Sequence, residues 1–505
     1  MSDSEGKKPK SRFPIYFAAG FSVVLSLLSL LGHFDLLESH WIDRLFVFHG
    51  ERMKDGDPRI TIAAIDDDSI KEHGWPFSRD VHAKLINRLV ALDAKTIAFD
   101  VMFLDPERSR SGGDQDLIDA TRRSRRTVHV GVATRQEQEV GDQKITLNQA
   151  RLPIPGLLDA SLYLGHPNVD EVIDGDGHIR RMKLFSDSLD DPKGLAKRWP
   201  TYDGAALAAF EGKSPAQYEG ELDPLWRLFY LNFRRPREWP IHPYERSRNP
   251  KSVVVGQVVA PYQHISVGDI VANRLTRQEK DAIRGGLVMV GSTAIGAFDH
   301  YASPFNKHTP GVEFHALMVD NMLHGDWLRD VSRGRNLAIL LAFIWVPLLL
   351  ARLPPVAGFG AIAAIVAGWI GFTQWRFLSG VRYDFVTPAL GLVASFIVVT
   401  VQRVLKEGAE KRAIQQTFGR FVSPDVVKDL AANPENAKIG ARERNMTVFF
   451  LDIAHFTTIS EKLKSTELFE FLNVYLSALT EVVEQEQKGT VDKYIGDCIM
   501  AFWNA

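Results

Sequence analysis

The stretch "VFFLDIAHFTTISEKL", residues 448–463, joins an apolar run to a helical pattern through one charge. Residues 446–451 form a continuous apolar segment, which is typical of a strand in the interior of a sheet. Asp452 stands where this strand ends, and residues 457–463 have the pattern of a short helical turn. A buried carboxylate is costly unless a partner compensates its charge. The charge of Asp452 therefore calls for a partner.

The residues after this stretch predict a second carboxylate at the same place. Ser465 is expected to cap a long helix, and "QKGT" ends that helix. "TVDKYIGDCIMAFW" then has two apolar runs around Gly496 and Asp497, the pattern of a β-hairpin. The expected helix carries its apolar residues on one face: Leu468, Leu472, Tyr475, Leu476, Leu479 and Val483.

If the hairpin pairs beside the first strand, Asp452 and Asp497 lie at the same end of one sheet. Two such carboxylates suit Mg²⁺, which binds one or two carboxylates and completes its shell with phosphates and water. Two unrelated aspartates in turns would give the same spacing. The spacing alone leaves both interpretations open.

These segments resemble a known enzyme family. "FFLDIAHFTTISE" and "VDKYIGDCIMAFW", preceded by "FGRFVSPDVV", are similar to the class III adenylate and guanylate cyclases. The resemblance implies an α+β, ferredoxin-like catalytic domain over residues 441–505. It implies that Asp452 and Asp497 hold two Mg²⁺ or Mn²⁺ ions per active site, with help from the carbonyl of Ile453.

The resemblance also implies how the substrate is bound. Main-chain N–H groups of Ala454, His455, Phe456 and Thr457 would approach the β- and γ-phosphates at the start of a helix. Lys493 falls at the purine-reading position, where a lysine donor suits the N1 acceptor of adenine. The implied reaction is attack of the ribose 3′-hydroxyl of ATP on its own α-phosphate, which gives cyclic AMP and pyrophosphate. A homodimer would share its active sites across the interface.

Two departures from the family pattern bear on activity. His455 stands where the family usually has Gly, so the backbone is expected to approach the triphosphate less freely. The chain reaches Ala505 directly after the hairpin, whereas family domains continue. We therefore expect a cyclase truncated within its catalytic domain, inactive as residues 1–505, with the transition-state Asn and Arg outside this chain.

Two other functions are compatible with these residues. One is a receptor with a degenerate cyclase fold that signals through dimer contacts, and the other is a guanylate cyclase. Retention of Asp452, Asp497 and Lys493 together favours an enzyme over the receptor. The net charge of −2, from 60 basic and 62 acidic residues, gives no indication of a nucleic-acid partner. The single cysteine, Cys498, excludes a disulfide within the chain.

Four apolar segments predict transmembrane helices. Each is close to the roughly 20 residues that cross the hydrocarbon of a bilayer. Buried helices of a soluble core are the alternative, but three segments almost back to back disfavour it. None has an ionisable residue in its apolar middle, which disfavours a transporter. The segments are residues 13–34, 336–351, 353–375 and 385–402.

The flanking charges predict the topology of a multi-pass protein of the cell or inner membrane, in contact with lipid. Lys7, Lys8, Lys10 and Arg12 place residues 1–12 in the cytoplasm by the positive-inside tendency. Four crossings return the C-terminal region to the same side, where ATP is available. Residues 35–333 then form an extracellular or periplasmic domain.

That domain has an α/β pattern. Three short β-branched runs, residues 59–65, 95–103 and 286–290, are typical of buried strands. Between the first two lies an amphipathic helix, "RDVHAKLINRLVALDA". A further helix is expected at "HTPGVEFHALMVDNML", with Thr309 as its cap and Pro310 in its first position.

Several of these segments resemble the second type of CHASE domain, a sensor found before bacterial cyclases and histidine kinases. They are "RITIAAIDDDSI", "GWPFSRD", "IAFDVMFLDPE" and "VMVGSTAIGAFDHYASPFNKHTPGVEFHALMVDNML". The family's layout of one span before the sensor and three after it agrees with the hydropathy. The resemblance implies an extracellular ligand, whose identity stays unknown.

Two charged segments of the sensor have alternative interpretations. Asp66, Asp67 and Asp68 could bind a cation or cap the following helix, and the cap is favoured. "RRPREWPIHPYERSR", residues 234–248, could face a ligand or form an exposed insertion, and the insertion is favoured.

Residues 403–440 form the connection to the cyclase domain. Val404, Leu405, Ala409, Ile414 and Phe418 recur at approximately helical spacing among charges, so the last span is expected to continue as a helix. Such a helix transmits a change of packing if two chains pair along it. A solvated connector is the alternative. Ser423 and Pro424 predict the start of another short helix.

Overall fold

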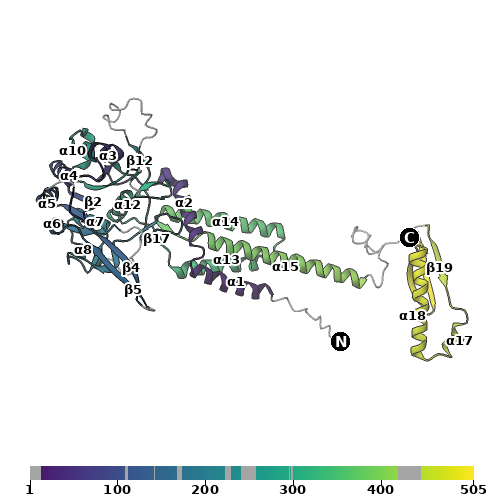
Figure 1. Cartoon of the computed structure of the whole chain (residues 1–505). Coiled ribbons are helices and arrows are strands. Elements are labelled where there is room, and N and C mark those ends of the chain that lie inside the picture. The colour runs from purple at the N-terminus through teal and green to yellow at the C-terminus, as the bar shows by residue number, and fades with distance from the viewer. Residues whose placement is uncertain are drawn as a thin grey trace. The chain divides into compact units, whose positions relative to one another are not determined.

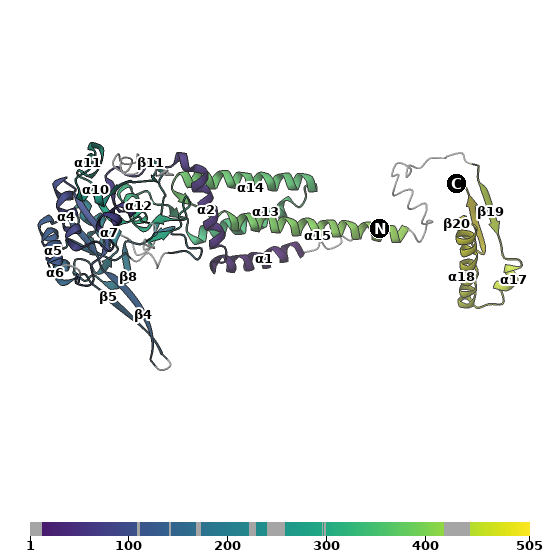
Figure 2. The ribbon, with the colours of Figure 1, turned by 45° about the horizontal axis from the view of Figure 1, so that its top comes forward.

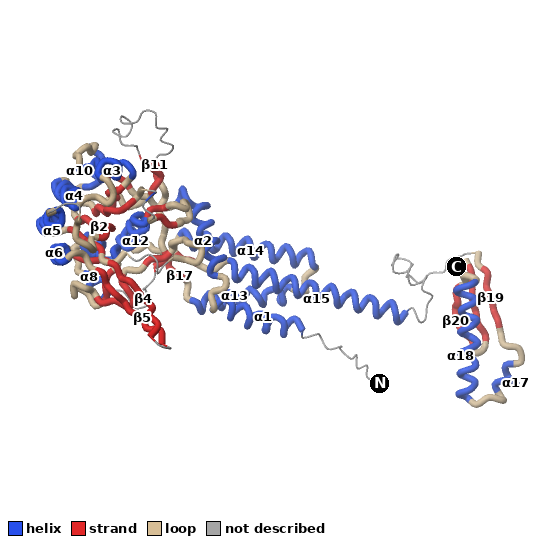
Figure 3. The backbone as a smooth tube through the Cα atoms, in the orientation of Figure 1, coloured by secondary structure: helices blue, strands red, loops and turns tan. Residues whose placement is uncertain are grey.

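The computed structural model describes residues 13–108, 112–140, 143–167, 173–221, 229–239, 258–294, 296, 299–418 and 445–504. Its contacts divide the chain into two compact units, Met1–Phe396 and Ile397–Ala505. Figure 1 labels the elements along the chain, and Figure 3 separates helices from strands by colour. The first unit combines a mixed α/β region with long apolar helices, and the second contains the Asp452 stretch. The predicted helix at Ser423 lies outside the described residues.

A six-stranded sheet with the order β13-β1-β14-β2-β3-β6 forms the centre of the first unit. All of its neighbouring strands are parallel, and β1 is buried along its whole length. The three strands predicted from sequence are confirmed as β1, β2 and β14. The strands are β1 Ile60–Ile65, β2 Thr96–Met102, β3 Thr127–Val130, β6 Tyr163–Gly165, β13 Gln263–Ser266 and β14 Leu287–Ser292.

Helices cover both faces of this sheet, as expected for parallel strands that are buried on two sides. Alternate residues of β1 divide between two cores: Ile60 and Ile62 join one, and Ala63 and Ile65 join the other. In Figures 1 and 2, α7 and α12 lie on the side of the sheet toward the long helices, and α4 and α5 on the opposite side. The helices are α2 Asp35–His49, α3 Asp67–His73, α4 Arg79–Ala91, α5 Gly113–Ser124, α6 Pro155–Ala160, α7 Tyr202–Glu211, α8 Pro215–Glu221, α10 Val267–Val271, α11 Arg277–Ile283 and α12 Gly311–His324.

Two details of helix capping in this region bear on the sequence predictions. Asp66 accepts a hydrogen bond from the N–H of Ser69 and forms a capping box at the start of α3, so the favoured interpretation of the acidic trio as a cap is confirmed. The prediction for α12 is wrong by one residue, because Pro310 itself holds the N-cap position. The hydroxyl of Thr309 instead contacts that of Ser303 at 2.8 Å.

Short antiparallel pairs complete the first unit. The longest is a hairpin, β4 Val132–Val140 with β5 Gln143–Arg151, which projects from the sheet region in Figure 2. A parallel pair, β17 with β18, joins the α/β region to the segment between α14 and α15. The remaining short strands are β7 Arg181–Met182, β8 Phe185–Asp190, β9 Arg198–Pro200, β10 Phe229–Tyr230, β11 Arg237–Trp239, β12 Val258–Ala260, β15 His300–Tyr301, β16 Thr309–Pro310, β17 Arg329–Asp330 and β18 Val381–Arg382.

Among the described residues, three helices are long and apolar enough to cross a membrane: α13 Arg333–Leu350, α14 Pro355–Leu378 and the first part of α15 Val386–Phe418. α1 Phe13–Leu30 passes the same test only together with α2, from which it is bent by 72°, so the count is three or up to four. Only 17% of the apolar window is buried in α13 and in α14, so most of this apolar surface needs lipid or another apolar partner. α15 continues beyond the predicted span at residue 402 as far as Phe418.

The second unit contains one antiparallel sheet of order β19-β21-β20 with helices between its first two strands in the chain. Its elements are β19 Thr447–Leu451, α17 Phe456–Ser460, α18 Ser465–Glu481, a π-helical turn Val482–Glu486, β20 Thr490–Ile495 and β21 Cys498–Trp503. Ser465 is the first residue of α18 and not its cap, because Lys464 holds that position and donates its N–H to Glu467 at 2.9 Å.

Candidate functional site

The sheet of the second unit brings the ends of its strands together around two carboxylates. Asp452 follows β19 directly, and Asp497 lies in the turn between β20 and β21. Leu451 of β19 pairs with Ile499 of β21. Asp452, which follows β19, and Asp497, which precedes β21, therefore lie at the same end of the sheet. Gly496, at φ 67°, permits the tight turn that presents Asp497.

The two carboxyl groups interact directly. A hydrogen bond with Asp497 raises the pKa of Asp452 above its usual range, helped by slight desolvation and by the charge of Asp497, and the N–H of Ile453 opposes this shift. Two carboxyl groups in contact share a proton unless a cation takes its place. Their oxygens are the ligand type that Mg²⁺ prefers.

The protein alone supplies few ligands to such a cation. Among the described residues, no group of three or more His, Cys, Asp or Glu side chains could hold a metal ion. A hard cation at the aspartate pair would therefore take its other ligands from water, from a main-chain carbonyl and from substrate phosphates. Mg²⁺ sites in phosphate-transferring proteins commonly have this composition.

The turn after Asp452 has an unusual backbone at His455. This residue has φ 59° and ψ 30°, in the left-handed region, and it precedes the first turn of α17. Glycine adopts this conformation easily, whereas other residues pay a steric cost. The carbonyl of Ile453 accepts a hydrogen bond from the N–H of Phe456 at 3.2 Å, which closes the turn. The loop thus has a conformation suited to Gly although His occupies it.

Lys493 lies on β20, the strand that leads into the Asp497 turn. Its side chain is 59% exposed, and its Nζ lies 3.4 Å from Oδ2 of Asp492. An exposed ammonium in such a weak ion pair is available to a ligand. Ala454 and Thr457 are also exposed, so the predicted phosphate-binding segment is open to solvent.

The second unit exposes many large apolar side chains. β19 is an edge strand, and four of its five residues are exposed. Soluble proteins seldom expose so much apolar surface unless it binds a partner. The exposed apolar residues include Val448, Phe449, Phe450, Phe469, Val474, Tyr494 and Ile495.

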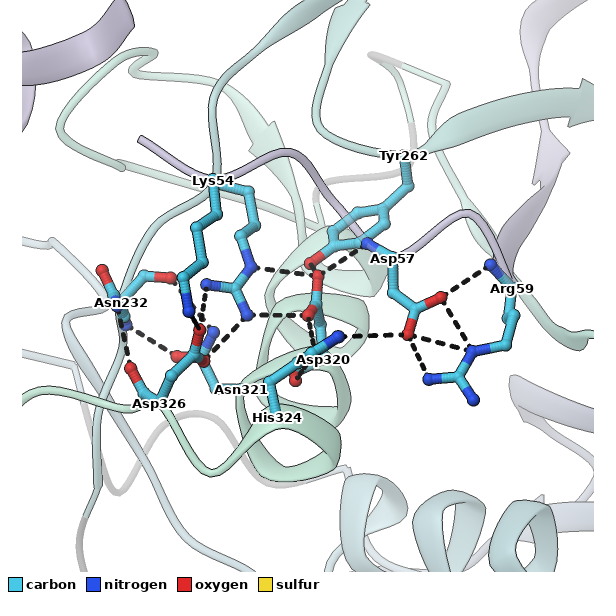
Figure 4. A network of polar contacts seen from close by, with 10 residues as sticks. Lys54, Asp57, Arg59, Asn232, Tyr262, Asp320, Asn321, His324 and Asp326 are labelled. Carbon is cyan, nitrogen blue, oxygen red and sulfur yellow. Dashed lines mark hydrogen bonds and ion pairs between the residues drawn. The ribbon is translucent and has the colours of Figure 1, made fainter. Parts of the chain in front are cut away.

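A polar network in the sensor includes residues that the sequence placed elsewhere. Arg234, the first residue of the segment expected as an exposed insertion, has a side chain only 2% exposed, so the favoured interpretation is wrong for this residue. Its guanidinium lies 2.7 Å from Asp320 and 2.9 Å from Asp326. Figure 4 shows these aspartates with Tyr262 and Lys54 around them. An aspartate inside the apolar helix sequence "HALMVDNML" was the available signal of a buried ion pair.

A second buried cluster joins the sheet to the helices on one face. Nδ1 of His315, in α12, lies 2.5 Å from Asp203 of α7, and Nε2 lies 3.9 Å from Asp100 of β2. Burial lowers the pKa of His315, but the charges of Asp203 and Asp100 outweigh it and raise the pKa to about 9. Burial raises the pKa of Asp100 to about 6, although His315 opposes the shift. The sequence predictions did not include this cluster.

A direct contact joins α2, which packs in the sensor core, to the start of α15. The carboxylate of Glu38 accepts hydrogen bonds from the N–H groups of Phe385, Val386 and Thr387 at 2.7–3.1 Å. Trp41 of α2 stacks on Phe385 with ring centroids 4.0 Å apart. A carboxylate at a helix N-terminus is favoured by the helix dipole. The helix that continues to Phe418 thus begins on the sensor.

Comparisons with known proteins agree with this division of the chain. A family model described as the CHASE2 domain matches residues 19–351. A second model, described as the adenylate and guanylate cyclase catalytic domain, matches residues 440–504. No solved structure matches the chain at a significant level.

Curated relatives match a part of the chain. The chain is similar to "Adenylate cyclase" of Anabaena cylindrica, with 40% identity over 90 residues, 17% of this chain and 18% of the relative. It is similar to "Adenylate cyclase 1" of Rhizobium meliloti, with 32% identity over 124 residues, 24% of this chain and 18% of the relative. The matched region therefore spans less than a fifth of the length of either relative.

Proposed function

Since this chain belongs to the CHASE2 domain family and carries an adenylate and guanylate cyclase catalytic domain near its C-terminal end, we propose that it is a membrane-bound adenylate cyclase controlled by its sensor domain. The proposed reaction converts ATP to cyclic AMP and pyrophosphate. The observation that carries this proposal is the contact between Asp452 and Asp497 at one end of the sheet.

In the proposed mechanism, Asp452 and Asp497 hold two Mg²⁺ or Mn²⁺ ions with help from the carbonyl of Ile453. Bound ions of this kind lower the pKa of an attacking hydroxyl and neutralise charge on leaving phosphates. The N–H groups of residues 454–457 orient the β- and γ-phosphates of the substrate. The left-handed backbone of His455 supports this role, because the turn keeps the shape that Gly would give it.

Lys493 supports adenine as the base. Its ammonium can only donate hydrogen bonds, which suits the N1 acceptor of adenine and not the N1–H donor of guanine. The names of the two bacterial relatives, both adenylate cyclases, agree with this choice. A guanylate cyclase would need an acceptor at this position.

A homodimer is part of the proposal, formed through the cyclase domain and the linker, which is residues 403–440. The exposed apolar residues of β19 and α18 support it, because a second copy would remove them from water. The proposed topology places the cyclase domain in the cytoplasm, where ATP is available, and the sensor outside. A degenerate receptor is the second candidate, favoured only by His455 in place of Gly.

The metal role is tested by Asp452→Asn and Asp497→Asn in the whole protein that contains these residues. We expect the rate of cyclic AMP formation to fall by at least about a hundredfold. Bound ions lower the free energy of the charged transition state by several kcal/mol, and these variants would lose the ions. Binding of Mn²⁺, followed by electron paramagnetic resonance, should weaken in both variants. The control Glu470→Gln changes an exposed carboxylate of α18 and should alter neither measurement.

Unchanged turnover in both aspartate variants would reject the metal assignment. Normal Mn²⁺ binding by a whole protein that makes no cyclic AMP would instead favour the degenerate receptor. For the base, Lys493→Glu should lower the ratio of kcat/KM for ATP over GTP. An unchanged ratio would remove Lys493 from purine recognition.

A further inference from the structure

The helix α2 has two apolar faces, of which only one is covered by the rest of the first unit. Ile42 and Phe46 belong to the hydrophobic core of that unit. The large apolar residues of the other face are exposed, and they are Leu36, Leu37, Val47 and Phe48. Eleven residues make about three turns of an α-helix, so Leu37 and Phe48, which is 72% exposed, lie on one line along α2. Such a surface needs an apolar partner.

The exposed face of α2 continues the exposed apolar surface of α1. Leu27 and Leu30 of α1, and Leu31 in the turn between the two helices, are exposed as well. α2 is bent by 72° from α1, so it runs close to the plane of the membrane when α1 crosses the bilayer. In Figures 1 and 2, α2 lies between the sheet region and the ends of the long helices. The exposed face therefore begins where the lipid-facing surface of α1 ends.

Polar contacts hold the inner face of α2 outside the hydrocarbon. Asp43 of α2 lies 2.6 Å from the guanidinium of Arg180, whose side chain is 3% exposed. Glu38 accepts hydrogen bonds from the N–H groups of residues 385–387. A deeper insertion of α2 would break this buried ion pair and leave charges without partners, which is strongly unfavourable. α2 is therefore not the second half of a broken span.

The charges of α2 are divided between its two faces. Arg44 and His40 are exposed, and both lie between Leu37 and Phe48 in the sequence. Glu38 and Asp43 point inward, as their contacts show. Within α2, which the structure describes completely, the only exposed carboxylate is Asp35, in the first turn. A face with basic and large apolar side chains suits the region of a bilayer where phosphates meet acyl chains.

We propose that α2 lies in the headgroup region of the bilayer that α1 crosses. Leu37 and Phe48 insert at the boundary with the acyl chains, and the guanidinium of Arg44 contacts lipid phosphate. This position requires the crossing of the bilayer by α1, which is part of the proposed function, but it does not require cyclase activity. The bilayer then acts on the helix that holds the start of α15 through Glu38.

The test measures the depth of nitroxide spin labels on the full chain in nanodiscs of phosphatidylcholine and phosphatidylglycerol. In a Cys498→Ser background, the label is attached to Leu37→Cys or Phe48→Cys. Leu27→Cys is the reference in the hydrocarbon, and Arg277→Cys, whose parent side chain is 97% exposed, is the reference in water. Power saturation compares the accessibility of each label to oxygen, which concentrates in hydrocarbon, with its accessibility to a polar nickel chelate.

We expect both labels on α2 to report the headgroup boundary. The ratio of oxygen to nickel accessibility at positions 37 and 48 should be about threefold or more above that at position 277, because a label near the acyl chains loses contact with the polar reagent. It should stay below the ratio at position 27. All four substituted side chains are exposed, so the variants should fold like the parent chain.

The phosphate contact has its own variants. Arg44→Glu should lower the ratio at position 48 toward its value in water, because a carboxylate repels phosphate. Arg44→Lys keeps the charge and should keep the ratio. Arg284→Glu, at an exposed arginine of the sensor, should leave the ratio unchanged. An unchanged ratio in Arg44→Glu would contradict the contact with phosphate.

The remaining outcomes separate this inference from the proposed function. Ratios at positions 37 and 48 equal to that at position 277, with position 27 in hydrocarbon, would reject the lipid contact of α2 alone. A ratio like that in water at position 27 would reject the crossing by α1 and the lipid contact with it. Low accessibility to both reagents, with spectra broadened by a second label, would show that a second copy covers this face instead of lipid. None of these readings depends on cyclic AMP formation.

Discussion

At the scale of residues, the sensor holds a buried histidine, His315, among three carboxylates. Asp203 of α7 contacts its ring, and Asp100 of β2 and Asp299 before β15 add negative charge from other elements. His166 and Tyr202 lie in the same buried region, and Tyr202 stacks edge-on to His315 at 4.9 Å. A proton on the imidazole of His315 would place a positive charge between Asp203 and Asp100. We infer that His315 is charged when the sensor is folded at neutral pH.

The stability of the sensor should fall as the pH rises above neutrality. The pKa of His315 is raised from 6.5 to about 9, so its contribution is complete below pH 6.5 and is lost as the pH rises to about 9. The shift corresponds to about 3 kcal/mol. The pKa of Asp100 is raised from 3.8 to about 6, so this group changes the stability only between these two pH values. That window lies below the one of His315, and Asp100 does not cancel the trend. Thermal unfolding followed by circular dichroism between pH 6.5 and 9 checks the slope.

His315→Gln should unfold at lower temperature at pH 6.5 and should lose most of this pH dependence. The control His308→Gln changes an exposed histidine and should keep the slope of the parent chain. A variant His315→Gln with the parental slope would show that another group titrates.

At the scale of elements, α2 and α15 form the link between the sensor and the linker. Glu38 receives three main-chain N–H groups and the hydroxyl of Thr387, at 2.9 Å, in the first turn of α15. The first N–H groups of a helix have no partner within the helix, so this carboxylate satisfies groups that would otherwise need water. The same helix continues without a break to Phe418. A change in α2 can therefore alter the position at which this long helix begins.

Glu38→Ala should loosen the start of α15. Loss of hydrogen bonds to a buried charged acceptor costs about 1–3 kcal/mol, which corresponds to roughly tenfold to hundredfold faster amide exchange. Hydrogen exchange read by mass spectrometry on peptides that cover residues 385–390 measures this effect. Glu410→Ala, at an exposed carboxylate of the same helix, should leave those peptides protected. Equal protection in Glu38→Ala and in the parent chain would contradict the role of Glu38.

At the scale of the whole molecule, α13, α14 and α15 lie between the α/β region and the three-stranded sheet along the chain. The first unit carries the CHASE2 match, and the cyclase match lies within the second unit. The proposed four-span topology would place the sensor and the cyclase domain on opposite sides of the membrane. Three helices and one bent pair are compatible with this topology by length and composition.

The topology can be tested with the natural cysteine. Cys498 is the single cysteine of the chain, and it lies on β21 in the proposed cytoplasmic unit. A membrane-impermeant maleimide should label it only after cells are lysed. In a Cys498→Ser background, Arg277→Cys in the sensor, whose parent side chain is 97% exposed, should be labelled in intact spheroplasts. Labelling of Cys498 in intact spheroplasts would reject the proposed topology.

Local pattern was sufficient for part of the sensor fold. The strands β1, β2 and β14 and the helix α4 were predictable because a buried run of six or seven residues has a clear pattern of its own. The strands β3, β6 and β13 were not predicted, because each has only three or four residues. So short a run acquires its structure from pairing with a neighbour.

The sequence by itself determined the apolar helices and the two aspartates at expected strand ends, because these depend on residue type, hydropathy and short-range periodicity. That the aspartates meet depends on the pairing of β19 with β21. Only the tertiary structure decided that Arg234 binds Asp320, 86 positions away, that His315 meets Asp203, and that Phe233 packs edge-on against Phe305 and Phe314. The physical reason is that ion pairs and aromatic contacts join residues across separate elements. Their energies depend on distance and burial, which the chain acquires only when the sheet and its helices pack together.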